Sequence, residues 1–187
     1  VKRIPLQEAI QQALDSNLLI RSANFQVDEK KALKGASWDL PKTSLDMQYG
    51  QFNSINRDNS FTITQSLSFP TVYSNQQKLA VAGIRSSEWE LKGSQLEIAT
   101  RVKQVYWQLV YLLEKQKLLA FQDSLFSGFQ RAAELRAKTG ETNRLEMITA
   151  RSQSLEVKNQ LQQNASDIGI GTRNLQVLLN TAWPVFP

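Results

Sequence analysis

One long stretch without breaks limits how this chain can fold more than any other feature. No proline occurs within residues 74–138, and the stretch holds only three glycines. Because proline breaks helices and glycine favours turns, these residues predict a single helix over 74–138. At 1.5 Å per residue, this helix would be on the order of 100 Å long. Such a length cannot be buried in a globule of 187 residues, so the helix must pair with another long element.

The apolar residues of this stretch have the spacing of coiled-coil helices. One series recurs every three or four residues, with Gln116 as its polar member: Ile98, Val102, Val105, Leu109, Leu112 and Leu119. A second apolar side consists of Tyr106, Val110, Leu113, Phe121, Leu125, Phe126 and Phe129. Sustained spacing of this kind is typical of helices that pack along their length. Two apolar sides predict neighbours on both flanks, as in a wall of helices.

The partner helix is expected after a short turn over residues 139–143. Gly140 is a natural left-handed residue at the end of a helix. Thr142 or Asn143 can cap the next helix, and Glu146 lies at capping-box spacing from Asn143. Apolar residues at helical spacing then predict a return helix over residues 144–180. The two long helices therefore form an antiparallel coiled-coil hairpin, and residues 181–187 are expected to be an exit linker.

Residues 1–41 are expected to form shorter N-terminal helices. Pro5 suits the first position of a helix, and the Asp-Ser-Asn sequence at residues 15–17 indicates a break or a cap. A second helix is expected over residues 18–37. It should end before Pro41, because the residue that precedes a proline avoids helical backbone angles.

Residues 42–70 change to a period of two, which is typical of strands with one apolar face. Strands are expected at residues 43–52 and 61–69, joined by a polar loop and closed by Pro70. Their apolar members are Leu45, Met47, Tyr49, Phe61, Ile63, Leu67 and Phe69. This β-hairpin can pack on a soluble core. Alternatively it faces lipid, because each strand approaches the roughly 9–11 residues that cross a bilayer. Aromatic residues near the strand ends, Phe52 and Tyr73 among them, favour the second alternative.

The composition excludes several classes of function. The chain has no cysteine and no histidine, which excludes disulfides, thiolate or imidazole catalysis and most zinc or copper sites within it. Acidic residues such as Glu156 and Asp167 are scattered, so we expect no catalytic residue, cofactor, metal or enzymatic activity. The net charge of +5 is interspersed, which argues against nucleic acid as a partner. No apolar run approaches the roughly 20 residues of a membrane-spanning helix.

Three segments, in this order along the chain, carry a resemblance to a known family. Residues 6–17 (LQEAIQQALDSN) hold an Ala-Leu pair followed by Asn, and residues 102–109 (VKQVYWQL) form a mid-helix stretch. Residues 136–151 (RAKTGETNRLEMITAR) place a basic residue before a turn glycine, then an acidic residue and an Ala-Arg pair. Together they resemble the outer-membrane efflux proteins, which are the TolC-like and metal-pump outer components of tripartite pumps.

The resemblance covers essentially the whole chain and implies a mainly α fold. A subunit of this family has two such units in tandem, and its trimer closes one twelve-stranded β-barrel and one twelve-helix periplasmic tunnel. The chain matches the first of these repeats, over residues 1–187 as a single unit. Either it is a piece of a longer subunit, which we favour, or more than three copies assemble.

The resemblance also implies a passive export duct in the outer membrane, with most of this segment in the periplasm. The implied partners are the second repeat, the homotrimer, outer-membrane lipid, a periplasmic adaptor protein and an RND-type inner-membrane pump. Whether drugs or metal ions are exported stays open. The competing class is a soluble coiled-coil interaction protein, such as the adaptor itself. A helical scaffold would leave the alternation at residues 45–49 and 61–69 unexplained.

Three groups of residues are candidate sites by the same resemblance. The adaptor-binding tip would comprise Thr139, Gly140, Glu141 and Thr142. The periplasmic gate would comprise Arg136, Glu146 and Arg151, with Glu146 repeated by symmetry as a ring of negative charge. The lipid-facing strands would present Leu45, Met47, Tyr49, Phe61, Ile63, Leu67 and Phe69. The simpler interpretations are a plain helix–turn–helix corner, a capping role for Glu146 and solvated arginines.

Overall fold

The structure is a computed structural model, and it describes residues 2–38, 41–51, 55 and 57–187. The chain divides into two compact units. Unit 1 comprises Val1–Arg21 and Ser94–Pro187, and unit 2 comprises Ser22–Gly93. The sequence predicts that residues 1–187 form a single unit. Whether unit 1 and unit 2 act as one stays a prediction.

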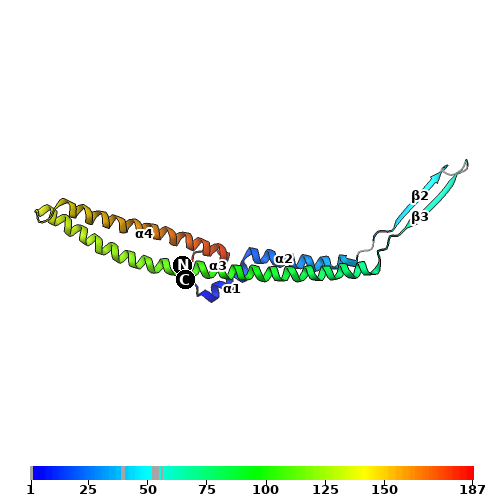
Figure 1. Cartoon of the computed structure of the whole chain (residues 1–187), viewed down its shortest axis with the longest axis horizontal. Helices are drawn as coiled ribbons and strands as arrows, with labels where there is room; N and C mark the ends of the chain where they lie inside the picture. The colour runs from blue at the N-terminus through cyan, green and yellow to red at the C-terminus, as the bar shows by residue number, and fades with distance from the viewer. Residues whose placement is uncertain (1, 39–40, 52–54, 56) are drawn as a thin grey trace. The chain divides into compact units, whose positions relative to one another are not determined.

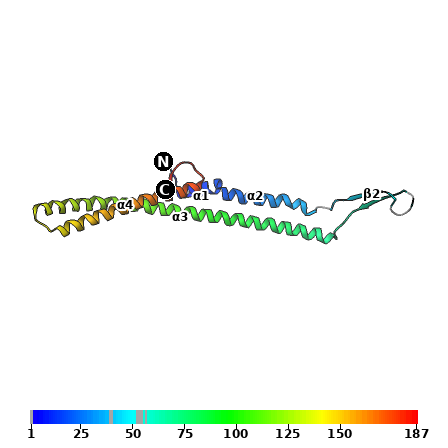
Figure 2. The ribbon, with the colours of Figure 1, turned by 90° about the horizontal axis from the view of Figure 1, so that it is seen from above.

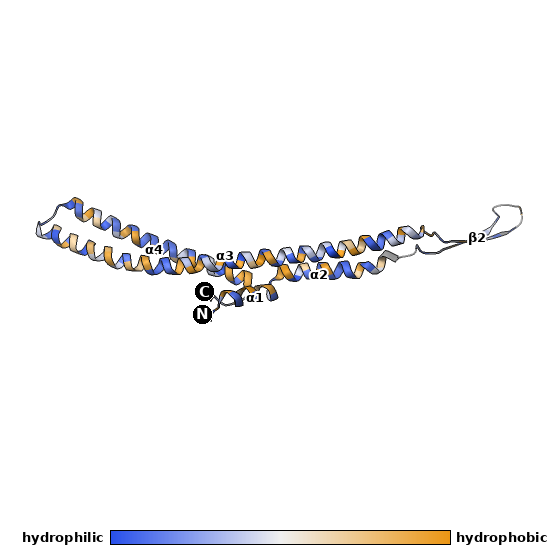
Figure 3. Ribbon diagram, turned by 60° about the horizontal axis from the view of Figure 1, so that its bottom comes forward, coloured by the Kyte–Doolittle hydropathy of each residue, from blue (hydrophilic) through white to orange (hydrophobic). Residues whose placement is uncertain are grey.

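Unit 1 is built on two antiparallel helices that lie side by side (Figure 1, Figure 2). They are α3 (Pro70–Thr139), which enters this unit at Ser94, and α4 (Arg144–Leu179). Apolar and polar residues alternate along both (Figure 3). The predicted apolar series of α3 is confirmed as the buried seam of the hairpin, with Val105 half-buried. The buried apolar residues of the seam are Ile98, Val102, Leu109, Leu112, Leu119, Val157, Leu175 and Leu179.

The second predicted apolar side of α3 is only partly covered, and Val110, Leu113 and Phe126 are half-buried. Tyr106 is buried and donates its hydroxyl to the Ile4 carbonyl at 3.2 Å. Phe121, Leu125 and Phe129 are exposed. An exposed apolar series on a helix is typical of a surface that another chain segment covers.

A close contact and a buried amide fix how α3 and α4 meet. Leu109 is fully buried against Gly171, where a methyl group would lie 2.8 Å from Leu109 Cδ2. Asn164 is 1% exposed and donates to the Leu112 carbonyl at 3.0 Å and to Gln116 Oε1 at 2.7 Å. The polar member of the predicted seam, Gln116, therefore has a polar partner across the interface.

The two ends of the chain pair with each other. Strand β1 (Lys2–Arg3) lies parallel to β4 (Val185–Phe186), and the Ile4 amide donates to the Phe186 carbonyl at 3.0 Å. Ile4 and Val185 are each 1% exposed. The expectation of an exit linker over residues 181–187 is therefore wrong for its last part, because burial of these apolar side chains holds the segment as a strand.

Helix α1 (Leu6–Ser16) is fastened to the end of α4 by hydrogen bonds. Ser16 Oγ donates to the Leu179 carbonyl at 2.8 Å, and Asn17 Nδ2 donates to the Leu178 carbonyl at 3.0 Å. Asn180 Nδ2 donates in return to the Ser16 carbonyl at 3.2 Å. The predicted break at residues 15–17 is thus the point where unit 1 joins its N-terminal helix to its hairpin.

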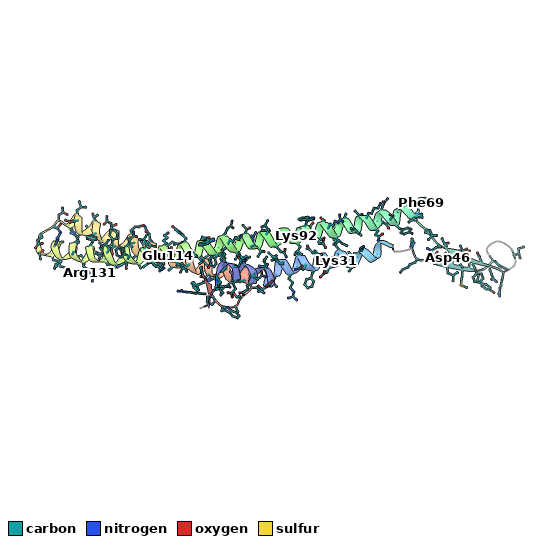
Figure 4. All side chains as sticks on the ribbon, turned by 90° about the horizontal axis from the view of Figure 1, so that it is seen from below. Lys31, Asp46, Phe69, Lys92, Glu114 and Arg131 are labelled. Atoms are coloured by element: carbon teal, nitrogen blue, oxygen red, sulfur yellow. The ribbon has the colours of Figure 1, made fainter. Side chains whose placement is uncertain are left out.

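Unit 2 contains most of α2 (Leu18–Leu33), the 3₁₀ helix η1 (Lys34–Trp38) and the start of α3. Within it, Val27 of α2 is buried, and Lys31 Nζ lies 3.8 Å from Glu88 of α3 (Figure 4). The predicted helix over residues 18–37 is α-helical only to Leu33, because Gly35 lowers the helical preference of the segment that follows. Asp39 and Leu40, near its predicted end, lie outside the described residues.

The β-hairpin of unit 2 has the two faces that the alternation predicts. Strands β2 (Ser44–Gly50) and β3 (Asp58–Thr64) are antiparallel. The apolar face pairs Leu45 with Ile63, Met47 with Phe61, and Tyr49 with Asn59. The opposite face pairs Ser44 with Thr64, Asp46 with Thr62, and Gln48 with Ser60. Only Asn59 departs from the apolar set.

The strands are shorter than expected, so Leu67 and Phe69 are not strand residues. The ladder ends at the pair Ser44 and Thr64. Beyond it, Gln65 donates its side-chain amide to the Pro41 carbonyl at 2.9 Å, and proline has no amide to continue the ladder. Helix α3 then begins at Pro70 instead of Ser74, since proline is favoured in the first turn of a helix. Phe52, the predicted end of the first strand, lies outside the described residues.

We expect Gly171→Ala to be less stable than Gly169→Ala by about 1–3 kcal/mol. Both gain the helix preference of alanine, but only the methyl group at Gly171 meets buried Leu109, whereas that at Gly169 meets nothing within 4 Å. Urea unfolding followed by circular dichroism measures the difference. Equal stabilities of the two variants would show that Leu109 does not pack on Gly171.

Candidate functional site at the tip of the helical hairpin

The turn between α3 and α4 has the conformation that its glycine predicts. Gly140 has φ +78°, in the left-handed region where glycine has no steric cost. The Glu141 amide donates to the Arg136 carbonyl at 2.9 Å, which closes the end of α3. Thr139 Oγ1 also donates to the Arg136 carbonyl, at 3.0 Å. The main chain of the turn is therefore set by its own hydrogen bonds.

The start of α4 is capped as the sequence predicts. Asn143 Oδ1 accepts the Glu146 amide at 2.9 Å, and Asn143 has extended backbone angles. The Thr142 hydroxyl donates to the Glu146 carboxylate. Glu146 thus lies in the first turn of α4, where a negative charge stabilises the helix dipole. This geometry supports the capping role of Glu146, and it leaves a second role of its charge open.

A groove of about 510 Å³ lies between the two helices next to the turn. Its lining is mostly small or apolar, with charges at the turn end: Phe126, Phe129, Ala132, Ala133, Arg136, Asn143, Leu145, Glu146, Thr149, Ala150 and Gln153. Phe129 is 57% exposed and Leu145 is 70% exposed. The lining thus combines small residues with large exposed apolar ones, which is the composition of grooves that bind amphipathic helices.

The structure brings two of the three predicted gate residues together. Arg136 and Glu146 both line the groove, whereas Arg151 is exposed and does not line it. Within the described residues, no ion pair joins Glu146 to Arg136 or Arg151. The tip residues Thr139, Gly140 and Glu141 are exposed, and Thr142 is half-buried.

The apolar face of the β-hairpin is a second candidate surface, and it is exposed throughout. Met47 is 66% exposed and Phe61 is 67% exposed. Leu45, Tyr49 and Ile63 are also exposed, as is Leu67 beyond the end of β3. Phe69, labelled in Figure 4, is exposed as well. Arg57 donates to the Tyr49 hydroxyl at 3.4 Å. A two-stranded sheet with one apolar face exposed is not stable alone in water, so this face needs a covering phase or partner.

Sequence reasoning missed the small residues that line the groove. Ala133 of α3 is at seam spacing, and Ala150 of α4 also lines the groove, so small residues on the two helices were the signal that could have indicated it. It also missed that Asn164 pairs with Gln116, although two polar residues in opposed seams are the expected arrangement.

In the described part of the chain, no helix combines the length and the apolar character of a membrane-spanning segment. No three His, Cys, Asp or Glu side chains of the described part gather where they could hold a metal ion.

Comparisons with known proteins identify the fold. No protein-family model and no curated protein matches the sequence. Solved structures do match, with probability 1.00. The CmeC outer membrane channel of Campylobacter jejuni has a TM-score of 0.76 at 16% identity, over 93% of this chain and 40% of its own. The outer-membrane channel OprN has a TM-score of 0.79 at 17% identity, over 94% and 43%.

The outer membrane protein VceC of Vibrio cholerae has a TM-score of 0.75 at 15% identity, over 94% of this chain and 47% of its own. The chain thus spans less than half the length of these solved chains. The predicted fold, half of a TolC-like subunit, is confirmed: a long helical hairpin with shorter N-terminal helices and a two-stranded β-hairpin. These neighbours are membrane channels or outer membrane proteins, and none is described as an enzyme.

We expect Asn143→Ala to weaken the start of α4 by about 1 kcal/mol, because the Glu146 amide loses its capping acceptor. Hydrogen exchange of the first turns of α4 measures this as about fivefold faster exchange. The matched control is Asn159→Ala, an exposed position inside α4, which should change exchange little. Similar effects of both variants would contradict the capping role.

Proposed function

We propose that this chain is one repeat of an outer-membrane channel subunit that forms the exit duct of a tripartite efflux pump. The observation that carries the proposal is the fold match, which covers 93–94% of this chain but only 40–47% of the channel chains described above. A share just below half suits one of two repeats. In such a pump the energy comes from an RND-type inner-membrane protein, so the duct itself needs no catalytic centre.

The β-hairpin would lie in the outer membrane with Leu45, Met47, Tyr49, Phe61 and Ile63 toward lipid. Their shared, exposed face supports this orientation, and the Ser, Thr and Gln residues of the other face would meet water. A two-stranded sheet leaves both outer edges unpaired, which is costly in lipid. The strands would therefore be closed into a barrel by the second repeat and by the other copies of a trimer.

The tip of the hairpin would bind a periplasmic adaptor through Thr139, Gly140, Glu141 and Thr142. The exposed turn and the adjacent groove support this role, because the groove offers an apolar lining beside the turn. The acidic side chain of Glu141 favours a polar contact at the turn itself. Apolar contacts would come from the groove, where Phe129 and Leu145 are exposed.

The charged residues near the tip would form the periplasmic gate of the duct. Symmetry would repeat Glu146 as a ring of negative charge that attracts cations. Arg136 shares the groove with Glu146 without pairing to it, and Arg151 is exposed, so both arginines are free to meet acidic groups of neighbouring copies. Such contacts would hold the mouth narrow.

Planar bilayer recordings of the full-length protein test this proposal. We expect channels from the wild type, and a higher conductance from Glu146→Ala and from Arg136→Ala, because each change removes a contact that holds the mouth narrow. Glu156→Ala is the matched control, since Glu156 is also an exposed acid of α4 but lies outside the groove at the turn.

The possible outcomes separate the channel from its gate. If no protein preparation forms channels, the channel proposal is wrong. If the wild type conducts but both variants conduct like the wild type and the control, the gate assignment is wrong while the channel remains.

A further inference from the structure

The hairpin of α3 and α4 is packed unevenly along its length. On α3, the buried residue nearest the turn is Leu119, and on α4 it is Ser154. Every residue from 120 to 153 is described, and none of them is buried. We call this range the tip segment and the hairpin residues outside it the packed segment. The tip segment therefore has two neighbouring helices but no core between them.

A polar layer separates the two segments. One carboxylate oxygen of Asp123, Oδ1, and the hydroxyl of Ser154 are both buried and have no hydrogen-bond partner among the described residues. The same holds for Oδ1 of Asn164 in the packed segment, although the Nδ2 group of Asn164 is fully used. Asn164 bonds to Leu112 across the seam. Asp123 lies eleven residues from Leu112 and Ser154 lies ten residues from Asn164, both toward the turn. At 1.5 Å per residue these are displacements of about 16 and 15 Å, so Asp123 and Ser154 occupy the same level of the antiparallel pair.

Such a layer resists close packing of the two helices. A buried oxygen without a hydrogen-bond partner loses part of its hydration at a cost in free energy. Admission of water to the layer removes that cost. Separation that lets water enter therefore lowers the free energy at the level of Asp123 and Ser154. Separation at the apolar layers of Leu109, Leu112 and Leu119 raises it, because buried apolar surface is exposed.

The residues beyond the layer offer little to oppose separation. The seam positions that follow on α3 are Phe126, Gln130, Ala133 and Ala137, and all four are only half-buried. Ala150 is their counterpart on α4, and the groove of about 510 Å³ lies among these residues. Regions with few buried apolar contacts are those that open locally at low free-energy cost.

We propose that the tip segment opens and closes separately from the packed segment, with Asp123 and Ser154 as the boundary. Opening moves α3 and α4 apart at the groove, and a ligand that fits the wider groove shifts the population toward the open form. The inference rests on packing within one hairpin, so its test does not depend on whether the proposed channel or gate function is correct.

Hydrogen exchange measured by mass spectrometry on the full-length protein tests this directly. We expect amides of residues 124–136 and 148–153 to exchange at least about tenfold faster than amides of residues 102–116 and 157–175, because only the first set exchanges through local opening. Equal protection of the two sets, or stronger protection of the tip, would overturn the proposal. This profile of the wild-type protein tests the separate opening of the tip segment even if a variant does not fold.

A double variant tests the boundary. Asp123→Leu with Ser154→Ala replaces the polar layer by an apolar one, and we expect exchange in the tip segment to slow at least about threefold. The control, Arg131→Leu with Ser152→Ala, also replaces one charged and one hydroxyl side chain, but at exposed positions of α3 and α4, and should leave tip exchange unchanged. Unchanged tip exchange in the first variant, with protection of residues 157–175 retained, would overturn the assignment of this layer.

Discussion

Close packing of α3 against α4 is the interaction on which the rest of unit 1 depends. Leu109 rests on Gly171, and Asn164 bonds to Leu112 and Gln116, so shape and polarity together fix the register of the two helices. That register places Arg136 and Glu146 at one groove. It also brings the end of α4 to Ser16 and Asn17, where hydrogen bonds attach the N-terminal helix. The same contacts that stabilise the hairpin therefore position the candidate site.

Each candidate surface of this chain lacks a partner of its own. The exposed aromatic residues of α3, the apolar face of the β-hairpin and the groove beside the turn are apolar areas that a stable isolated domain rarely presents. In the proposed channel, repetition of the unit would cover all three areas, because helices, strands and tips would each meet their equivalents or an adaptor. Coverage of all three areas by one arrangement favours the proposed channel repeat over a soluble coiled-coil protein. The latter would leave the apolar face of the β-hairpin without a role.

The sequence predicted the elements with strong local signals. The absence of proline predicted α3. The turn and the cap followed from Gly140 and Asn143, and the alternation predicted both faces of the β-hairpin. The sequence-based predictions failed where individual side-chain contacts determine where an element ends or which segments pair. The second strand ends early because Gln65 bonds to Pro41. Strands β1 and β4 have two residues each, too few to show a period, and they pair opposite ends of the chain. The groove depends on which alanines face each other, which spacing alone does not reveal.

The central claim is that the β-hairpin faces lipid on one side only, and single cysteines test it most directly. The chain has no cysteine of its own, so fluorescent labels can be placed at Leu45, Asp46, Met47 or Gln48 of the full-length protein in lipid vesicles, after replacement of any cysteine elsewhere. The account predicts that a lipid-dissolved quencher acts on labels at residues 45 and 47, and that iodide acts on those at 46 and 48. Quenching of all four labels by iodide, with none by the lipid quencher, would contradict it.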